Sequence, residues 1–299
     1  MRVEVTRALQ LDQRQQTQLD LHSFLNVLNV LSGDLLLFHD AAGREPFAAT
    51  LEACYQVSDT FQSDPSLGRV LQQFEKLRQQ FSLDCQANQV LANSLEVAVK
   101  EQWDNLQSVV AVLDIRYAEM KARLQASDGW ITFHLPGLRR EIEAFLGVVE
   151  KNSLGRYHIV TNVACKKPRD YLVHLQFASL HEEEMDMPGV LKDVLRDLLA
   201  NARKYTEPGG TIEVGLAETQ ACIRLVVKDN GRGIPEDQLQ QVVEFGFRGR
   251  NVAAHETKGA GFGLTKAYWV ARHYQGKMWI ESAEQAGTTI TIEIPRRPA

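Results

Sequence analysis

Residues 12 to about 127 carry apolar side chains at spacings of three and four positions. This spacing places them along one face of an α-helix, so it predicts a largely helical segment. The first stripe has the pattern of a heptad seam, which suits packing against other helices. It consists of Leu21, Phe24, Leu28, Leu31, Leu35 and Phe38.

A second apolar stripe predicts a longer helix over roughly residues 86 to 126. It comprises Leu91, Leu95, Trp103, Leu106, Val110, Leu113, Tyr117, Met120 and Leu124. Between residues 12 and 127, prolines occur only at Pro46 and Pro65, in short polar stretches typical of turns between helices. We therefore expect about four helices in residues 1–127, either as one bundle or as a dimerising stalk.

The pattern changes near residue 128, where "ASDGWITFHLPG" marks a domain boundary. Amphipathic helices are predicted over 138–152 and 188–206. Short runs rich in β-branched and aromatic residues predict strands over 156–163, 171–177, 210–218, 220–230, 276–282 and 288–295. Consecutive strands with segregated helices are typical of an α/β sandwich with a mixed sheet. The expected fold class is therefore α plus α/β, with a helical bundle over 1–127 and the sandwich over 128–299.

The composition is that of a globular protein and argues against some classes of partner. The chain of 299 residues is 44% hydrophobic and 24% charged, which is ordinary for a globular protein. Its formal net charge of −5 argues against nucleic acid or an anionic membrane surface as a partner. No apolar run approaches the roughly 18 residues needed to cross a bilayer, and the first residues lack the apolar core of a signal peptide.

The four cysteines are scattered along the chain and form no C-x-x-C pair. They are Cys54, Cys85, Cys165 and Cys222. This usage is typical of a reduced protein and gives no sign of a structural zinc site. We therefore expect a cytoplasmic protein without membrane insertion by this chain.

Four short segments of the second domain carry the candidate chemistry. They are "DLLANARKYT" at 197–206, "DNGRGIP" at 229–235, "EFGFRGR" at 244–250 and "KGAGFGL" at 258–264. Asp229 lies at the end of a predicted strand, where its carboxylate can accept a hydrogen bond from an exocyclic amine. Gly231 and Gly233 let the backbone approach a flat ring closely. A glycine-rich loop precedes the last predicted helix, whose N-terminal N–H groups can bind phosphate. Its glycines are Gly259, Gly261 and Gly263.

In this order, the segments resemble the N, G1, F and G2 boxes of sensor histidine kinases. They also resemble the wider ATPase superfamily of gyrase, mismatch-repair ATPases and heat-shock chaperones. The resemblance covers about residues 185–295 and implies ATP with Mg²⁺. It implies that Asp229 accepts a hydrogen bond from the adenine N6 and that Asn201 ligates Mg²⁺. The other residues that it places at the nucleotide are Lys204, Tyr205, Phe245, Arg248, Arg250, Lys258, Leu264 and Thr289.

Asp197 departs from the histidine kinase pattern, which usually has Asn at this position. Chaperone and gyrase relatives carry an acid there, which activates water for hydrolysis. Asp197 could therefore act as a general base, assist Mg²⁺, or only complete a hydrogen-bond network. Taken singly, each of the four segments would also fit an ordinary turn or a solvated helix, and their occurrence together favours the nucleotide site.

The stretch "HSFLNVLNVLSGDLLL" at 22–37 resembles the H box of hybrid-type kinases. The matching positions are His22, Phe24, Asn26, Leu28, Ser32 and Gly33. The resemblance implies that His22 is the phosphoacceptor, because a neutral imidazole is a nucleophile near neutral pH. Ser23 stands where the family has Glu or Asp, and serine is a poor base. His22 could instead be an ordinary surface histidine of a bundle helix.

The leading hypothesis is an ATP-dependent histidine kinase of a two-component system. The phosphoryl group would pass from ATP to His22 and then to an aspartate of a response-regulator receiver domain. A homodimer through the helical bundle is possible. The alternatives are an ATPase, a kinase acting on a partner protein, or a nucleotide-sensing docking protein in which His22 is not phosphorylated.

Overall fold

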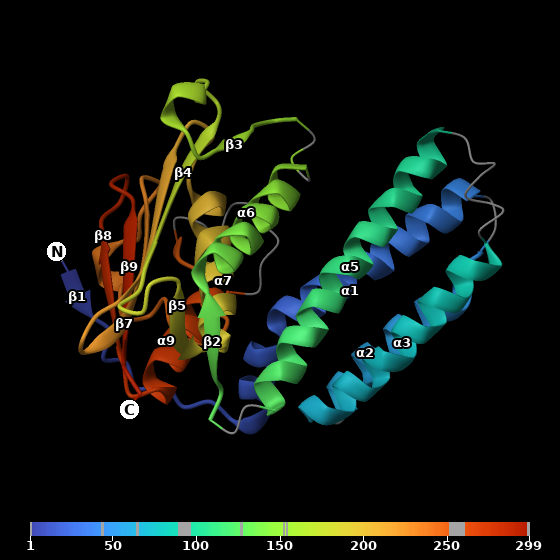
Figure 1. Ribbon diagram of the computed structural model, residues 1–299, viewed down its shortest axis with the longest axis horizontal. Coiled ribbons are helices and arrows are strands. Elements are labelled where there is room, and N and C mark those ends of the chain that lie inside the picture. The colour runs from blue at the N-terminus through green and yellow to red at the C-terminus, as the bar shows by residue number, and fades with distance from the viewer. Residues whose placement is uncertain are drawn as a thin grey trace. The chain divides into compact units, whose positions relative to one another are not determined.

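The computed structural model describes residues 2–42, 45–63, 66–88, 97–125, 128–151, 153, 155–250 and 261–297. The chain divides into two compact units (Figure 1). One is Leu11–Gln125, and the other joins Met1–Gln10 to Ala126–Ala299. The expected helical segment, residues 12 to about 127, falls in the first unit, whereas the domain drawn over 1–127 also included residues that lie in the second unit. Strand β1 (Arg2–Glu4) pairs with β8 (Lys277–Ser282), so the first residues complete the sheet of the C-terminal unit.

The helical unit contains α1 (Gln13–Ala42), α2 (Ala48–Ser63), α3 (Leu67–Ala87) and α5 (Val97–Gln125). Figure 1 shows α1 along α5 and α2 along α3. One apolar core is shared by all of these helices. The first predicted stripe is confirmed, since each of its six side chains is at most 1% exposed. Its phenylalanines pack edge to face with neighbours, as in the Phe24–Phe74 pair at 4.8 Å between ring centroids.

The second predicted helix is wrong at its start. Helix α3 ends at Ala87, where the N–H of Asn88 donates to the Asp84 carbonyl oxygen, and α5 begins at Val97. Along α5, Trp103, Leu106, Leu113 and Met120 are buried, while Val110 and Tyr117 are half-buried against the same core. Leu91, Leu95 and the side chain of Leu124 lie outside the described residues.

The C-terminal unit is built on a mixed sheet, as predicted. Its strand order is β1-β8-β9-β7-β6-β4-β3. The remaining strands are β3 (Ile159–Val160), β4 (Tyr171–Ala178), β6 (Thr211–Glu218), β7 (Cys222–Asp229) and β9 (Thr288–Pro295). The β3–β4 and β4–β6 pairs are parallel, and the other pairs in this sheet are antiparallel. A separate antiparallel pair, β2 (Trp130–His134) with β5 (Glu184–Pro188), was not predicted.

Three helices lie over one face of this sheet (Figure 1). They are α6 (Leu135–Lys151), α7 (Val190–Tyr205) and α9 (Gly263–His273). Their apolar faces and the inward-facing side chains of the central strands form one core. Single 3₁₀ turns occur at η1 (Val163–Cys165) and η2 (Glu236–Gln238). This arrangement brings the C-terminal end of α7, the end of β7 and the start of α9 close enough to share contacts.

Among the described residues, no single helix is both long and apolar enough to cross a membrane. The two parts of α1, Gln13–His22 and Phe24–Asp40, pass that test only when they are taken together as a bent pair.

Candidate nucleotide-binding site

The C-terminal half of α7 carries the first group of predicted site residues. Its apolar face is buried in the core through Leu195, Leu198 and Leu199. The side chains of Asn201, Lys204 and Tyr205 lie on the remaining surface and are half-buried, whereas the Oδ2 atom of Asp197 is buried and faces Lys266. The helix periodicity therefore separates the residues that hold α7 in place from the residues available to a ligand.

Asp229 ends strand β7 and organises the loop that follows it. Its carboxylate Oδ1 accepts a hydrogen bond of 2.9 Å from the N–H of Gly231. It also accepts one from the backbone of Thr288 on the neighbouring strand β9. Burial raises the pKa of the Asp229 carboxyl group above its ordinary value, although both hydrogen bonds oppose that shift. Asp229 is therefore a largely enclosed carboxylate with acceptor capacity left for a ligand.

Two glycines let this loop pack between neighbouring segments. A side chain at Gly231 would overlap the carbonyl oxygen of Tyr205. The next residue, Arg232, donates its N–H to that same carbonyl oxygen over 3.0 Å. Gly233 has a φ of +69°, and a side chain there would overlap the Ala283 carbonyl oxygen. The loop thus lies directly between the end of α7 and the turn that joins β8 to β9.

The register of β7 and β9 shows which of two adjacent threonines lies beside Asp229. Asp229 is paired with Thr288, whereas Thr289 is paired with Lys228 and Glu281. Because successive side chains of a strand point to opposite faces, Thr288 shares a face with Asp229 and Thr289 lies on the other face. Thr288, rather than Thr289, is therefore the residue beside Asp229. The sequence motif alone carried no signal to separate two adjacent threonines.

The F-box segment lies against residues 261–262 of the glycine-rich segment. The rings of Phe245 and Phe262 have centroids 4.5 Å apart. Gly261 has a φ of +75°, and a Cβ there would lie 2.6 Å from the carbonyl oxygen of Phe247. The hydroxyl of Thr265 donates to the Glu244 carbonyl oxygen over 3.0 Å. Lys258 and Gly259, which were predicted at the site, lie outside the described residues.

The start of α9 meets α7 at Asn201. A Cβ on Gly263 would lie 2.6 Å from the Asn201 Nδ2 atom, so a larger residue there would displace the Asn201 side chain. The adjacent Leu264 is half-buried and packs against the core. The predicted Mg²⁺ ligand and a helix N-terminus suited to phosphate therefore lie next to each other.

Comparison with known proteins identifies this arrangement. Residues 188–298 match the family described as histidine kinase-, DNA gyrase B-, and HSP90-like ATPase. This part of the chain matches the ATPase domain that histidine kinases share with DNA gyrase B and HSP90. The resemblance to sensor histidine kinases drawn from the four segments is thereby confirmed.

The curated relatives that match are sensor kinases. The chain is 34% identical over 113 residues to adaptive-response sensory kinase SasA of Nostoc sp., covering 38% of this chain and 28% of that protein. It is 32% identical over 107 residues to sensor histidine kinase WalK of Bacillus subtilis, covering 35% of this chain and 18% of that protein. The chain thus matches less than a third of the length of either relative. Among solved structures, the catalytic domain of histidine kinase ThkA has a TM-score of 0.41 and 23% identity, covering 56% of this chain and 99% of that one.

Positive charge gathers at the end of α7 in the ATPase domain. Burial lowers the pKa of Lys204, and the charges of Arg248 and Arg203 lower it further. Burial raises the pKa of Tyr205, and Arg248 opposes that shift. The Lys204 ammonium lies 5.3 Å from the centre of the Tyr205 ring. Clustered, partly desolvated cations are stabilised by an anion, so this electrostatic environment suits a polyphosphate.

Arg250 forms an exposed ion pair at the η2 turn. Its guanidinium forms a two-point ion pair with the carboxylate of Asp237, with distances of 3.0 and 2.8 Å. The backbone N–H of Arg250 donates to the Gln238 side-chain oxygen over 3.2 Å. Arg250 is therefore held at the η2 turn. Arg248, in contrast, is close enough to Lys204 and Tyr205 for its charge to act on the pKa of both side chains.

Lys266 is the site-adjacent residue that sequence reasoning missed. It lies in α9, is fully buried, and places its Nζ atom 3.5 Å from Asp197 Oδ2 and 3.6 Å from Asp193 Oδ2. The available signal was a lysine that interrupts the apolar face of a predicted helix. Its partners could not be read from the sequence, because they lie on another helix.

In the helical unit, His22 lies on α1 and is half-buried. The Nδ2 atom of Asn26, one helical turn later, is 3.1 Å from His22 Nε2. The side chain of Ser23 lies outside the described residues. The structure thus places His22 on helix α1 with a polar neighbour that can orient its ring.

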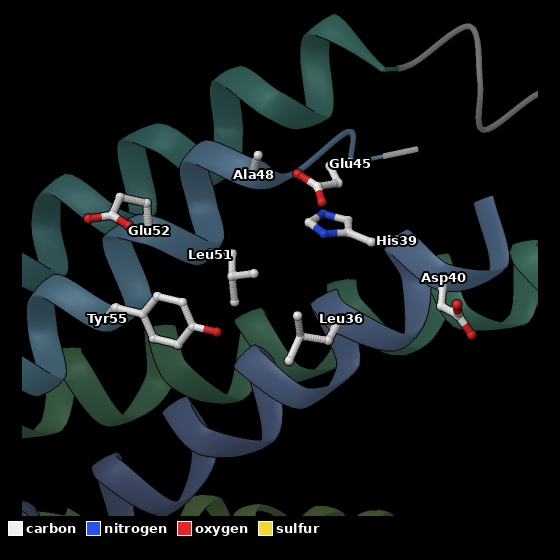
Figure 2. Close-up of a pocket in the computed structure, with 8 residues that line it drawn as sticks. All are labelled: Leu36, His39, Asp40, Glu45, Ala48, Leu51, Glu52 and Tyr55. Carbon is white, nitrogen blue, oxygen red and sulfur yellow. The ribbon is translucent and has the colours of Figure 1, made fainter. Parts of the chain in front are cut away.

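The same unit contains a pocket of about 580 Å³ (Figure 2). Its lining residues are Leu36, His39, Asp40, Glu45, Ala48, Leu51, Glu52 and Tyr55. His39 accepts a hydrogen bond from the Phe47 N–H, and burial lowers the pKa of its imidazole. The three carboxylates around this pocket disfavour a phosphate, so it is a poor candidate for the nucleotide site.

Proposed function

We propose that this chain is an ATP-dependent protein histidine kinase of a two-component signalling system. The observation that carries the proposal is the contact network joining Asp229 and its loop, Asn201 on α7, and the glycine-rich start of α9. The sensor kinases among the matched relatives support the same activity. In this proposal, residues 128–299 bind ATP and the helical unit provides the phosphotransfer and dimerisation functions.

The nucleotide would be selected at its base and held at its phosphates. The Asp229 carboxylate accepts a hydrogen bond from the exocyclic amine of adenine, and Thr288 lies on the same face of the sheet. The cations Lys204 and Arg248 offset charge on the triphosphate. The N–H groups at the start of α9 bind phosphate oxygens. Phe245 and Tyr205 contribute aromatic surface near the two glycine loops.

The residues present fit a Mg²⁺ ion that is bound together with the nucleotide. Among the described residues, no group of three or more His, Cys, Asp or Glu is arranged to hold a metal by itself. Mg²⁺ in nucleotide sites commonly takes only one or two protein oxygens and completes its shell with phosphate and water. The Asn201 side-chain amide, beside the start of α9, provides one such oxygen. When bound, the ion would neutralise charge on the transferred phosphoryl group.

His22 would be the phosphoacceptor. Asn26 donates to His22 Nε2 when the imidazole proton is on Nδ1, which fixes the ring orientation in the resting protein. For transfer, a neutral imidazole nitrogen forms a bond to the γ-phosphorus while the bond from the γ-phosphorus to the bridging oxygen breaks, and ADP leaves. The phosphoryl group then passes to an aspartate of a response regulator. The cytoplasmic location and the homodimer stay predictions.

The decisive experiment measures phosphoryl transfer from γ-labelled ATP with Mg²⁺ in wild type and in His22→Ala. The expected result is a label that is stable in alkali, labile in acid and absent from the variant. The matched control is His39→Gln, which changes another histidine of α1 and keeps an acceptor for the Phe47 N–H. This control is expected to retain the label.

Other outcomes separate the alternative functions. A label that persists in His22→Ala would move the acceptor to another residue. Bound ATP with ADP release and no phosphoprotein would favour an ATPase. Bound ATP with neither product would favour a nucleotide-sensing docking protein.

A further inference from the structure

Lys266 is a buried lysine with no exposed surface at all. Lysine is almost never fully buried unless it is paired. Its partners are Asp193 and Asp197, whose Oδ2 atoms lie 3.6 and 3.5 Å from the ammonium nitrogen. The two aspartates are four residues apart on α7, so they lie on the same face of that helix. One lysine of α9 therefore joins two consecutive turns of α7.

The position of Lys266 in α9 is itself unfavourable for a cation. Its N–H donates to the Phe262 carbonyl oxygen, which places it in the first hydrogen-bonded turn. The partial positive charge at a helix N-terminus favours carboxylates and disfavours an ammonium group. The carboxylates of α7 are thus stabilised by both the helix end and the lysine, whereas Lys266 depends on the carboxylates. Removing one partner of a buried ion pair leaves an uncompensated charge.

The two aspartates are not equivalent. Asp193 also lies 3.5 Å from the guanidinium of Arg196, which in turn approaches Glu141. Asp193 therefore keeps a counter-charge if Lys266 is removed. Within the part of the chain that the structure describes, Lys266 is the cation paired with Asp197. The loss of Lys266 would consequently act mainly through Asp197.

A second contact between the same helices lies at the nucleotide site. One turn beyond Asp197, Asn201 approaches Gly263, which is three residues before Lys266. Helices α7 and α9 thus meet at two adjacent contacts, one between Lys266 and Asp197 and one between Gly263 and Asn201. The Lys266–Asp197 contact is inside the domain. The Gly263–Asn201 contact includes the proposed Mg²⁺ ligand and the start of the phosphate-binding helix.

We propose that Lys266 is a positioning residue of the nucleotide site. By balancing the buried charge of Asp197, it allows α9 to pack against α7 at the distance at which Gly263 meets Asn201. Asp197 is then a structural counter-ion rather than a general base for hydrolysis. This inference rests on the proposed function, because it assumes that the site binds a nucleotide with Mg²⁺.

The test compares wild type with Lys266→Met, Asp197→Asn and the double variant. The affinity for a non-hydrolysable ATP analogue is measured by calorimetry with and without Mg²⁺. Lys266→Met is expected to weaken Mg²⁺-dependent binding by about tenfold or more, and Mg²⁺-free binding by less. Asp197→Asn, and the double variant, should stay within about threefold of wild type, because neither leaves Asp197 charged without a partner.

Lys192→Met is the matched control. Lys192 is another nearly buried lysine, 9% exposed at its side chain, and pairs with Glu141 over 2.7 Å. Its removal tests whether the loss of any buried ion pair in this domain weakens binding. The expected affinity of this control is that of wild type.

Three results would overturn the inference. The first is wild-type affinity in a folded Lys266→Met variant. The second is equal loss of Mg²⁺-dependent and Mg²⁺-free binding. The third is a double variant as weak as Lys266→Met. If Lys266→Met does not fold, the double variant decides: a folded, nucleotide-binding double variant supports the charge argument, and an unfolded one refutes it.

The role of Asp197 is tested separately by ADP release from ATP. A general base contributes on the order of a hundredfold or more, so Asp197→Asn should remain within about threefold of wild type if Asp197 is a counter-ion. A hundredfold loss would restore the general-base role. Absence of nucleotide binding by the wild type would instead contradict the proposed function itself.

Discussion

Replacing Asp229 with Asn should weaken nucleotide binding and stabilise the nucleotide-free protein. In the structure, the Asp229 carboxylate accepts two backbone hydrogen bonds, from Gly231 and Thr288, and is otherwise enclosed. An Asn side chain has one acceptor oxygen and one donor nitrogen. If the Asn oxygen keeps the hydrogen bond from the Gly231 N–H, the –NH₂ group faces the adenine amine. Both groups are then hydrogen-bond donors, so no hydrogen bond forms between them. Loss of one hydrogen bond to a charged acceptor costs about 1.5–3 kcal/mol, or roughly 10- to 150-fold in affinity.

Although Asp229→Asn should weaken nucleotide binding, it should raise the free energy of unfolding of the nucleotide-free protein. Burial raises the folded-state pKa of Asp229 above its ordinary value of 3.8. The contribution of this carboxyl group to stability is therefore fully present below pH 3.8 and is lost as the pH rises through the raised folded-state value. Near pH 7 the ionised group destabilises the empty protein. A neutral Asn removes this penalty, so the apo variant should unfold at a higher temperature than wild type.

Calorimetric titration with ATP and Mg²⁺, together with thermal unfolding of the apo protein, measures both effects. The matched control is Glu213→Gln, which neutralises an exposed carboxylate of strand β6 that pairs with Lys228. This control should leave the affinity unchanged. Unchanged ATP affinity in Asp229→Asn would refute the assignment of Asp229 to the adenine amine. A lower unfolding temperature would refute the argument that its burial is a cost in the empty site.

Further expectations concern individual site residues. Asn201→Ala should reduce Mg²⁺-dependent affinity more than Mg²⁺-free affinity by calorimetry, and equal loss would make the residue structural. Gly263→Ala should weaken Mg²⁺-nucleotide binding on the order of tenfold, because the new methyl group would displace the Asn201 side chain. Thr288→Val should weaken binding while Thr289→Val does not, and the reverse order would contradict the β9 register. Because burial and neighbouring arginines lower the pKa of Lys204, affinity should fall as pH rises through that lowered value, and Lys204→Met should remove this dependence.

The sequence predicted correctly several features that depend on a single helix, strand or turn. The heptad seam of α1 correctly predicted its buried face, because a helix turns every 3.6 residues whatever it packs against. The glycines of "DNGRGIP" predicted a close backbone approach, and the structure gives Gly231 and Gly233 backbone neighbours that exclude a side chain. The order of the four segments was enough to indicate the ATPase family, since each segment is local in the chain.

Partners between elements were decided only by the tertiary structure. The short β1 strand carries too few residues for a periodic signal, and it is defined by its pairing with β8. Thr288 and Thr289 have the same chemistry, and only the pairing register with β7 tells which one lies beside Asp229. The sequence by itself determined that Asp197 departs from the family pattern. That its charge is balanced by Lys266 follows from the packing of α9 on α7, which brings together residues far apart in the chain.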